Sequence, residues 1–437
     1  MNLLGQFFGR IIAGGGFTRR SRVGVPSGVF AMAVLTLHVA WSQTPTTTNS
    51  TDRSAFASES AESSWFTVDC DYAGGNIIVD RLEGDHVYVH QDLRDTSGNW
   101  FYWNFRVKGA AGRSLTIHFT DTNVIGVRGP AVSNDGGKNW RWLGAGAVRD
   151  QSFTYTCAAD EKEVRFCFAM PYVQENLDAF LLAYRDHPHL HVAPLCQSQK
   201  GRDVSRLHIG RLDGDPKHRV LITCRHHCCE MMASYSLEGL MAAALADSDD
   251  GRWMAENVEL LVVPIMDADG VAEGDQGKNR KPHDHNRDYS GTSLYPEVKA
   301  LRELVKTWSD SRLEFALDLH DPYIRGGSAE IIYFVEGDGP TTENVRRFAR
   351  ILESTRQGPL PFRAADNMPF GQAWNTASNY TSGTPFSHWA GQLPNIRFAS
   401  TIEIPYANVS GQAVNPDSAR ALGADLAAAL RIFLDKP

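Results

Sequence analysis

Strand-like and helix-like segments alternate along the second half of this 437-residue chain, from about residue 202 to its end. Short continuous apolar runs, typical of strands buried on both faces, are separated by longer segments with apolar residues at helical spacing. Strands are expected at 219–224, 258–266, 313–319, 329–335 and 400–404, and helices at 231–245, 294–308, 341–353 and 416–434. The alternation predicts an α/β fold, with helices on both faces of one sheet.

The region before residue 190 has a different pattern. Short alternating segments at 86–90, 100–107, 114–119 and 163–170 are separated by turn sequences such as 95–98 and 134–137. Closely spaced short strands with few helical periods favour an antiparallel β-sandwich. We therefore expect a β-sandwich domain over residues 65–190 and the α/β domain over residues 191–437.

The first 64 residues have the composition of a leader and a linker. Arginines at positions 10, 19, 20 and 22 precede an apolar run of eleven residues at 29–39, and Ala40 and Ser42 then offer small residues for cleavage. A signal peptide is expected over residues 1–42 and a Ser/Thr-rich linker over 43–64, so the chain is expected to be exported to the periplasm or beyond. A short buried helix is the alternative interpretation of the apolar run.

Charge and cysteine content exclude several classes of protein. The chain has 43 Lys and Arg against 51 Asp and Glu, a net charge of −8, which argues against a nucleic-acid binder. No apolar run reaches the ~20 residues of a membrane span, so none is expected in the mature chain. None of the seven cysteines forms a CxxC pair, which excludes a four-cysteine zinc knuckle.

Candidate metal ligands follow two of the expected strands. His227 and Glu230 lie three residues apart just after strand 219–224, and His320 follows strand 313–319. Imidazole nitrogens and a carboxylate oxygen can hold one metal ion and leave a position for water. Each residue alone fits a structural role, but the carboxyl ends of strands in such a sheet are where ligands gather.

Two further features belong to the same edge. The loop 278–289 carries Arg280, Asn286 and Arg287, which could stabilise an oxyanion or bind a carboxylate; a solvated basic loop is the alternative. Glu403 is a lone carboxylate in an apolar strand, where an unpaired charge is costly to bury. Beside a metal-bound water, it could act as a general base.

Six motifs together resemble the M14 family of zinc carboxypeptidases, and within it the cytosolic-carboxypeptidase-like branch. The motifs are, in order, HCCE at 227–230, PIMDADG at 264–270, KNR at 278–280, DHNRD at 284–288, DLH at 318–320 and TIEI at 401–404. The resemblance covers residues 202–437, and region 65–184 is similar to the β-sandwich that precedes the catalytic domain in that branch. It implies a mixed β-sheet of the zinc carboxypeptidase type.

The resemblance also implies a metal site and a base. His227, Glu230 and His320 would bind one zinc ion, and Asp284 would orient the first zinc histidine. Glu403 would be the general base and acid of the reaction.

For the substrate, the resemblance implies four more roles. Asn286 and Arg287 would bind its terminal carboxylate, and Arg280 would polarise the scissile carbonyl. Tyr380 is a candidate for the mobile tyrosine that caps the substrate, with an ordinary loop residue as the alternative.

The chain departs from the family pattern at the zinc motif. Cys228 and Cys229 replace the usual Pro-Gly, and we expect Cys229 to pack at the helix start and Cys228 to be inert or adjacent to the ligands. His226 is an alternative ligand to His227. Arg325 could meet an acidic substrate side chain or lie at the surface. Intracellular members of the branch shorten glutamate chains, and an exported chain would not share that substrate.

The expected function is a zinc metallocarboxypeptidase, an exopeptidase that hydrolyses the C-terminal peptide or isopeptide bond of peptides and proteins. One alternative is a zinc amidase or deacylase acting on a non-peptide carboxylate. The other is a secreted binding protein with a degenerate enzyme domain. The sequence indicates neither the preferred C-terminal side chain nor the oligomeric state.

Overall fold

The computed structural model describes residues 61–62 and 65–436. The expected signal peptide at 1–42, and the linker at 43–64 except for residues 61–62, lie outside the described residues. Strand β1 (Ala61–Glu62) pairs antiparallel with β2 (Thr67–Asp69). The sheet structure therefore begins within the last residues of the segment expected to be a linker.

A seven-stranded sheet forms the second half of the chain. Its strands lie in the order β12-β13-β15-β14-β16-β18-β17. Their bounds are β12 (Leu190–Gln197), β13 (Asp203–Gly210), β14 (His218–Cys224), β15 (Val258–Val263), β16 (Leu313–His320), β17 (Tyr333–Val335) and β18 (Phe398–Glu403). The four inner strands β15, β14, β16 and β18 are parallel, and the outer pairings are antiparallel. The predicted mixed α/β sheet is confirmed.

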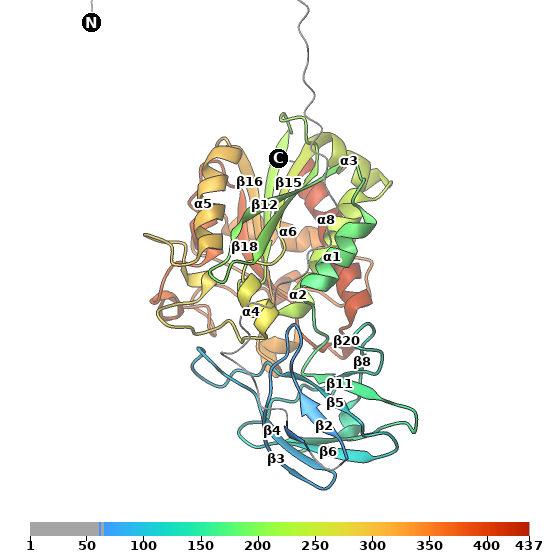
Figure 1. The fold of residues 1–437 in the computed structure, drawn as a ribbon. Helices are drawn as coiled ribbons and strands as arrows, with labels where there is room; N and C mark the ends of the chain where they lie inside the picture. Colours follow the sequence, from blue (N-terminus) through green and yellow to red (C-terminus); the bar gives the residue numbers. More distant parts are fainter. Residues whose placement is uncertain (1–60, 63–64, 437) are drawn as a thin grey trace, which may run out of the picture. The chain divides into compact units, whose positions relative to one another are not determined.

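Helices cover this sheet. They are α2 (Met231–Leu245), α3 (Asp249–Asn257), α4 (Ala268–Glu273), α5 (Pro296–Trp308), α6 (Thr342–Thr355), α7 (Phe386–Ala390) and α8 (Pro416–Asp435). In Figure 1, α5 lies to the left of the strands and α3 and α8 lie to their right. Every residue of β14, β15 and β18 is buried, as strands covered on both faces require.

Helix α2 is held in place from two sides, and this matters because it begins directly after Glu230. Glycines let α8 approach it closely: a Cβ on Gly239 would lie 2.0 Å from the Arg420 carbonyl oxygen. At its first turn, the backbone N–H groups of Met232 and Ala233 donate to the Asp321 carboxylate at 2.8 and 2.9 Å. A carboxylate at a helix N-terminus is favourable, so Asp321 ties the start of α2 to the end of β16.

Two smaller sheets precede the seven-stranded one, in the orders β1-β2-β5-β11-β7-β8 and β3-β4-β6-β10-β9. Their remaining strands are β3 (Ile78–Glu83), β4 (His86–His90), β5 (Asn104–Lys108), β6 (Ser114–Phe119), β7 (Ala131–Ser133), β8 (Arg141–Trp142), β9 (Val148–Arg149), β10 (Ser152–Thr156) and β11 (Glu163–Cys167). Phe153 of one sheet contacts Phe166 of the other, with ring centroids 5.2 Å apart. One pairing, β4 with β6, is parallel, so this region is not wholly antiparallel as expected.

Several expected elements differ in extent. The expected strand 100–107 begins only at Asn104, because the backbone of Tyr102 bonds instead to the Gln276 side chain at 2.7 and 2.9 Å. Helix α1 (Gln174–Ala183) lies in a region expected to hold only strands. The strand expected at 329–335 is reduced to β17. The domain boundary expected at residue 190 coincides with the start of β12 and stays a prediction.

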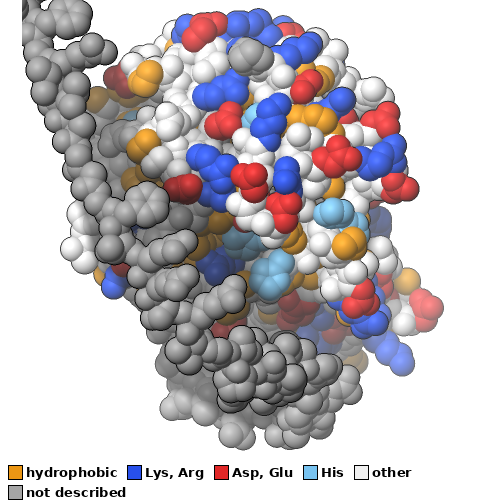
Figure 2. All heavy atoms as spheres, turned by 90° about the horizontal axis from the view of Figure 1, so that it is seen from above, with side chains coloured by type: hydrophobic (Ala, Val, Ile, Leu, Met, Phe, Trp, Pro, Cys, Tyr) orange, Lys and Arg blue, Asp and Glu red, His pale blue; other side chains and the backbone are white. Residues whose placement is uncertain are grey.

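Among the described residues, no helix is long and apolar enough to cross a membrane. On the face drawn in Figure 2, the described Lys and Arg side chains are interspersed with Asp and Glu side chains.

Candidate metal centre

The carboxyl ends of three neighbouring parallel strands carry the candidate site. His227 follows β14 by three residues, His320 is the last residue of β16, and Glu403 is the last residue of β18. His320 and Glu403 are register partners in the β16–β18 pair. The prediction that strand ends bring these residues to one edge of the sheet is confirmed by this register.

His227, Glu230 and His320 form a compact group of donor atoms, all buried and within 4.8 Å of one another. The His227 Nδ1 atom lies 3.1 Å from Glu230 Oε1 and 3.1 Å from His320 Nδ1. The His320 Nδ1 atom lies 2.6 Å from Glu230 Oε2. Two imidazole nitrogens and one carboxylate therefore converge on one point, which is a donor set that zinc accepts.

The far nitrogen of each ligand histidine faces a carboxylate. His227 Nε2 lies 3.5 Å from Asp284 Oδ1, as the predicted role of Asp284 requires. His320 Nε2 lies 2.6 Å from Asp318 Oδ2. A carboxylate on the outer nitrogen fixes the tautomer and direction of a metal-binding imidazole. The donor set and these outer carboxylates together fit a metal ion at His227, Glu230 and His320.

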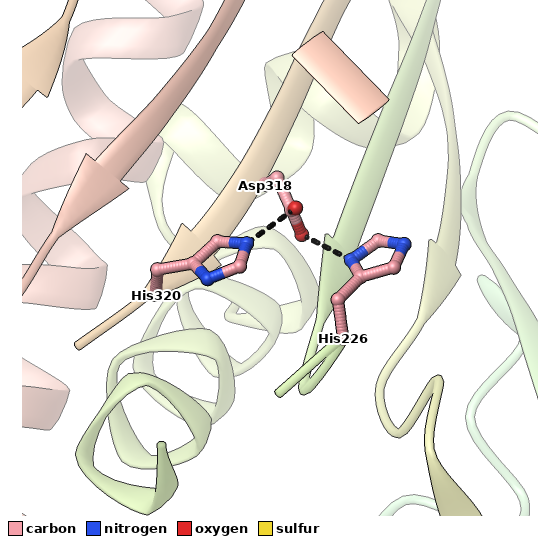
Figure 3. A group of neighbouring side chains, drawn as sticks. All are labelled: His226, Asp318 and His320. Atoms are coloured by element: carbon pink, nitrogen blue, oxygen red, sulfur yellow. Dashed lines mark hydrogen bonds and ion pairs between the residues drawn. The ribbon is translucent and has the colours of Figure 1, made fainter. Parts of the chain in front are cut away.

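The role of Asp318 was not predicted, although the residue stands in the DLH motif. Figure 3 shows its carboxylate between the rings of His226 and His320. Its second oxygen lies 2.9 Å from His226 Nδ1. Burial lowers the pKa of His320, but the carboxylates of Asp318 and Glu230 outweigh burial and raise it well above its usual value. The sequence signal for this contact was an acidic residue two positions before a strand-final histidine, since both side chains then point to the same face of the sheet.

His226 was the alternative ligand, and the structure favours His227. Both ring nitrogens of His226 are engaged, Nδ1 by Asp318 and Nε2 by the Tyr289 hydroxyl at 2.7 Å. His226, Asp318 and His320 also lie close enough to form a second candidate group. In that group the Asp318 carboxylate already contacts both histidine rings. We therefore treat His226 as a partner of Asp318.

The two cysteines between His227 and Glu230 both contact groups other than the candidate ligands. The Cys228 thiol donates to the Asp275 carbonyl oxygen at 3.1 Å, and the Cys229 sulfur lies 3.8 Å from the Tyr406 hydroxyl. Burial raises the pKa of the Cys229 thiol to about 12, so it carries a proton rather than a thiolate charge. No disulfide bond joins any of the seven cysteines, all of which lie among the described residues.

Glu403 has the environment of a proton acceptor. Its side chain is 6% exposed, and its Oε2 atom has no hydrogen-bond partner among the described residues. Burial raises the pKa of its carboxyl group to about 7, against the opposing effects of nearby His320 and Lys278. A carboxyl group tuned toward neutral pH can accept and return a proton efficiently.

The residues expected to bind the substrate carboxylate lie in a 3-10 turn at 285–287. Arg287 is part-buried. Its guanidinium donates to the Asn286 carbonyl oxygen and lies 5.4 Å from the centroid of the Tyr380 ring. Among the described residues, it forms no ion pair. Asn286 is engaged: its Oδ1 accepts from Phe386 N, and its Nδ2 lies 3.3 Å from His320 Nε2. Tyr380 lies beside Arg287, and its hydroxyl donates to the Asn375 side-chain oxygen at 2.7 Å.

Arg280 and Arg325 are both bound to protein groups. The Arg280 guanidinium contacts Asp267 at 2.6 Å and Asp275 at 2.8 Å. Arg325 donates to backbone oxygens at 123 and 125. The substrate roles expected of both arginines stay predictions.

Comparison with known proteins finds carboxypeptidases among the similar proteins, although no protein-family model matches the chain. Cytosolic carboxypeptidase 2 of Xenopus tropicalis is 25% identical over 180 residues, which are 39% of this chain and 19% of that protein. Cytosolic carboxypeptidase 6 of Caenorhabditis elegans is 21% identical over 250 residues, 51% of this chain and 54% of that protein. The chain thus spans less than two thirds of either relative.

Solved structures agree along most of the chain. A metallo-carboxypeptidase from Burkholderia cenocepacia superposes with a TM-score of 0.68 at 22% identity, over 85% of this chain and 99% of that one. A metallo-carboxypeptidase from Pseudomonas aeruginosa, in complex with (2-guanidinoethylmercapto)succinic acid, superposes with a TM-score of 0.66 at 21% identity, over 84% of this chain and 99% of that one. The chain therefore shares the fold of these metallo-carboxypeptidases.

Both solved structures are described as metallo-carboxypeptidases. The candidate position for a metal ion is the group of His227, Glu230 and His320. Its donor atoms converge, and a carboxylate contacts the outer nitrogen of each imidazole.

Proposed function

We propose that the chain is a zinc metallocarboxypeptidase that removes the C-terminal residue of peptides or proteins, at a peptide or isopeptide bond. His227, Glu230 and His320 would hold one zinc ion. When bound, zinc makes water more acidic and polarises carbonyl groups. The curated relatives named cytosolic carboxypeptidases, and the convergence of the three donor atoms, support this proposal.

The protein's own residues would move the proton and hold the substrate. Glu403 would take one proton from the attacking water, while the oxygen of that water forms a bond to the carbonyl carbon of the bond being cleaved. The carbon–nitrogen bond then breaks, and Glu403 delivers the proton to the leaving amine. The products are a shortened chain with a new terminal carboxylate and a free amino acid.

Arg287 would make the reaction an exopeptidase by binding the terminal carboxylate of the substrate, with Asn286 beside it and Tyr380 closing over it. The lack of an ion pair at Arg287 among the described residues supports this role, since a part-buried guanidinium without a carboxylate partner is suited to bind one. The polarising role expected of Arg280, whose guanidinium contacts Asp95, Asp267 and Asp275, stays a prediction.

The observation that carries the proposal is the pairing of Glu403 with the donor group. A buried carboxylate with one unpartnered oxygen stands in register with His320, at the same edge as the other two candidate ligands. The test compares peptides that have a free C-terminus with the same peptides amidated. Release from the free forms alone supports the proposal. Cleavage of the amidated forms contradicts exopeptidase action, and release only from non-peptide acylated substrates favours the amidase alternative.

Changing Arg287 to Ala is expected to raise KM by about 10–100-fold, with a smaller change in kcat. Hydrogen bonds to a charged group contribute about 1.5–3 kcal/mol, which corresponds to that range. Steady-state kinetics on one free-ended peptide measures the effect. Arg287→Lys keeps the charge but loses the planar guanidinium, so its KM is expected to lie between those of the parent chain and Arg287→Ala. An unchanged KM in Arg287→Ala would show that the terminal carboxylate is bound elsewhere.

Export is also part of the proposal, and it rests on the sequence of residues 1–42 alone. N-terminal sequencing of protein secreted by its host, with a start near residue 43, would support it. A cell-retained protein that keeps residue 1 would contradict it.

A further inference from the structure

Two histidines form a close pair on one of the smaller sheets, apart from the candidate metal centre. The Nδ1 atom of His86 lies 3.0 Å from the Nε2 atom of His118. His86 belongs to β4 and His118 to β6, which are neighbouring parallel strands. Both histidines lie on the face turned to solvent, because Val87 and Ile117, which alternate with them, are fully buried. The proposed carboxypeptidase mechanism uses neither histidine.

A stacked tyrosine orients the His118 ring. Tyr88 is the register partner of His118, and the two ring centroids lie 4.7 Å apart with an interplanar angle of 15°. Arg81 of β3 lies over the same tyrosine ring, 3.5 Å from its centroid. Because β4 lies between β3 and β6, the Tyr88 ring stands between this guanidinium and His118. The His118 imidazole is therefore held in position before any ligand binds.

The protonation state of His118 also suits a metal ligand. Burial of the ring lowers its pKa, and the neighbouring His86 and Arg81 lower it further. A neutral imidazole can give a nitrogen lone pair to a metal ion, whereas an imidazolium cannot. At neutral pH, His118 is therefore uncharged and able to coordinate.

A carboxylate lies beside the histidine pair. Glu83 of β3 is the register partner of His86, and it interacts electrostatically with both histidines. Its side chain forms an exposed ion pair with Arg81, at 2.7 Å. Exposed ion pairs contribute little to stability, so Glu83 can leave Arg81 for a metal ion at small cost. The three side chains together offer two nitrogens and one oxygen.

The spacing of the two nitrogens favours one kind of ion. Two nitrogens 3.0 Å apart, each about 2.1 Å from a shared ion, subtend an angle of about 90° at that ion. This is the angle between adjacent ligands in a square-planar or tetragonal site, the geometry that Cu²⁺ adopts with nitrogen and oxygen donors. A tetrahedral zinc ion would hold the nitrogens about 3.4 Å apart. Cu²⁺ is also the divalent ion that such donors bind most tightly.

We propose that His86 and His118 are the nitrogen ligands of a second metal site, which binds Cu²⁺, and that Glu83 supplies a carboxylate oxygen to it. The site shares no residue with His227, Glu230 and His320, so it is independent of the proposed carboxypeptidase function. The bound ion would link β3, β4 and β6 on their solvent face.

The test titrates Cu²⁺ into the untagged full chain after saturation with zinc, and follows it by electron paramagnetic resonance. The parent chain is expected to bind one more copper ion than His118→Gln, with a spectrum that shows two nitrogen ligands. His86→Gln and His118→Gln should each lower the affinity of that site by at least about 10–100-fold, because losing even an outer partner of a metal ligand has that effect. Glu83→Gln should cause a smaller loss.

His90 provides the matched control. It lies on the same strand and face as His86, and its Nδ1 atom lies 2.9 Å from Asp80. His90→Gln is expected to bind copper as the parent chain does. The same copper stoichiometry and affinity in the parent chain and His118→Gln would overturn the proposal, and the pair would then be only a hydrogen bond between two imidazoles. An equal loss of affinity in His90→Gln and His118→Gln would also contradict it.

Discussion

Replacing Glu403 with Gln is expected to lower kcat by roughly 10²–10⁴-fold, the usual contribution of a positioned general acid–base group. The amide has the size of the carboxylate but cannot take a proton from water. Glu403 is not one of the three candidate ligands, so zinc binding should persist. Steady-state kinetics and zinc quantification on the same preparation measure both effects.

The stability of the variant gives a separate readout. Burial disfavours the charged form of Glu403, as the raised pKa of about 7 records. At pH 8, the neutral amide should therefore keep or increase the free energy of unfolding. Loss of activity through misfolding would appear as a lower free energy of unfolding instead. A Glu403→Gln protein that is zinc-loaded, stable and fully active would refute the assignment of the base.

Replacing Asp318 with Ala is expected to affect both the metal site and the fold. The Asp318 carboxylate is fully buried between His226 and His320, at 2.9 and 2.6 Å. Removing one partner of a buried ion pair costs about 3–5 kcal/mol of stability. Loss of the carboxylate that orients a ligand imidazole typically weakens metal binding by about 10–100-fold. Denaturant unfolding and zinc titration against a competing chelator measure the two effects.

A matched control lies on the same strand. Glu314 stands near the other end of β16, is 20% exposed and accepts from His218 at 3.0 Å. Glu314→Ala also removes a carboxylate from a histidine, but far along the strand from the candidate ligands. Glu314→Ala should lower the free energy of unfolding less than Asp318→Ala, because Glu314 is partly solvated. It should leave zinc affinity unchanged. Equal zinc affinities in Asp318→Ala and the parent chain would contradict the orienting role of Asp318.

Much of the catalytic half could be predicted because local pattern and global fold agree there. Strands β14 and β15 contain apolar runs at 220–222 and 260–263, as burial on both faces of a sheet favours. His320 and Glu403 could be assigned to one edge because parallel neighbours end on the same side. Helix α8 was predicted within one residue, since Pro416 marks its first turn and Asn415 caps it.

The edge strand β12 and its neighbour β13 were not predicted, and for β12 the residues explain why. Strand β12 contains Pro194 and shifts register between Pro194 and Cys196, so it lacks the alternation of a regular strand. Helix α1 had a usable signal in Leu177, Phe180 and Leu181, which lie at helical spacing after Asn176. That signal is short, and it lies next to a region rich in strand patterns.

The positions of Lys278 and Arg280 could not be predicted from the sequence. Both depend on a segment about 180 residues earlier, since Trp100 contacts Lys278 and Asp95 contacts Arg280. A motif match assigns a role by spacing, but the partners of a loop arginine come from the tertiary fold. The KNR motif therefore indicated the loop, but not which of its two cations contacts Glu230.

The central claim is that a metal ion at His227, Glu230 and His320 supports release of the C-terminal residue. The most direct measurement follows amino acid release from peptides with acidic, basic and apolar C-termini, before chelation, after chelation and after zinc is restored. We predict release that is lost with the metal and returns at one zinc ion per chain. Release that is unaffected by complete metal removal, or stoichiometric zinc without release from any peptide, would contradict the account.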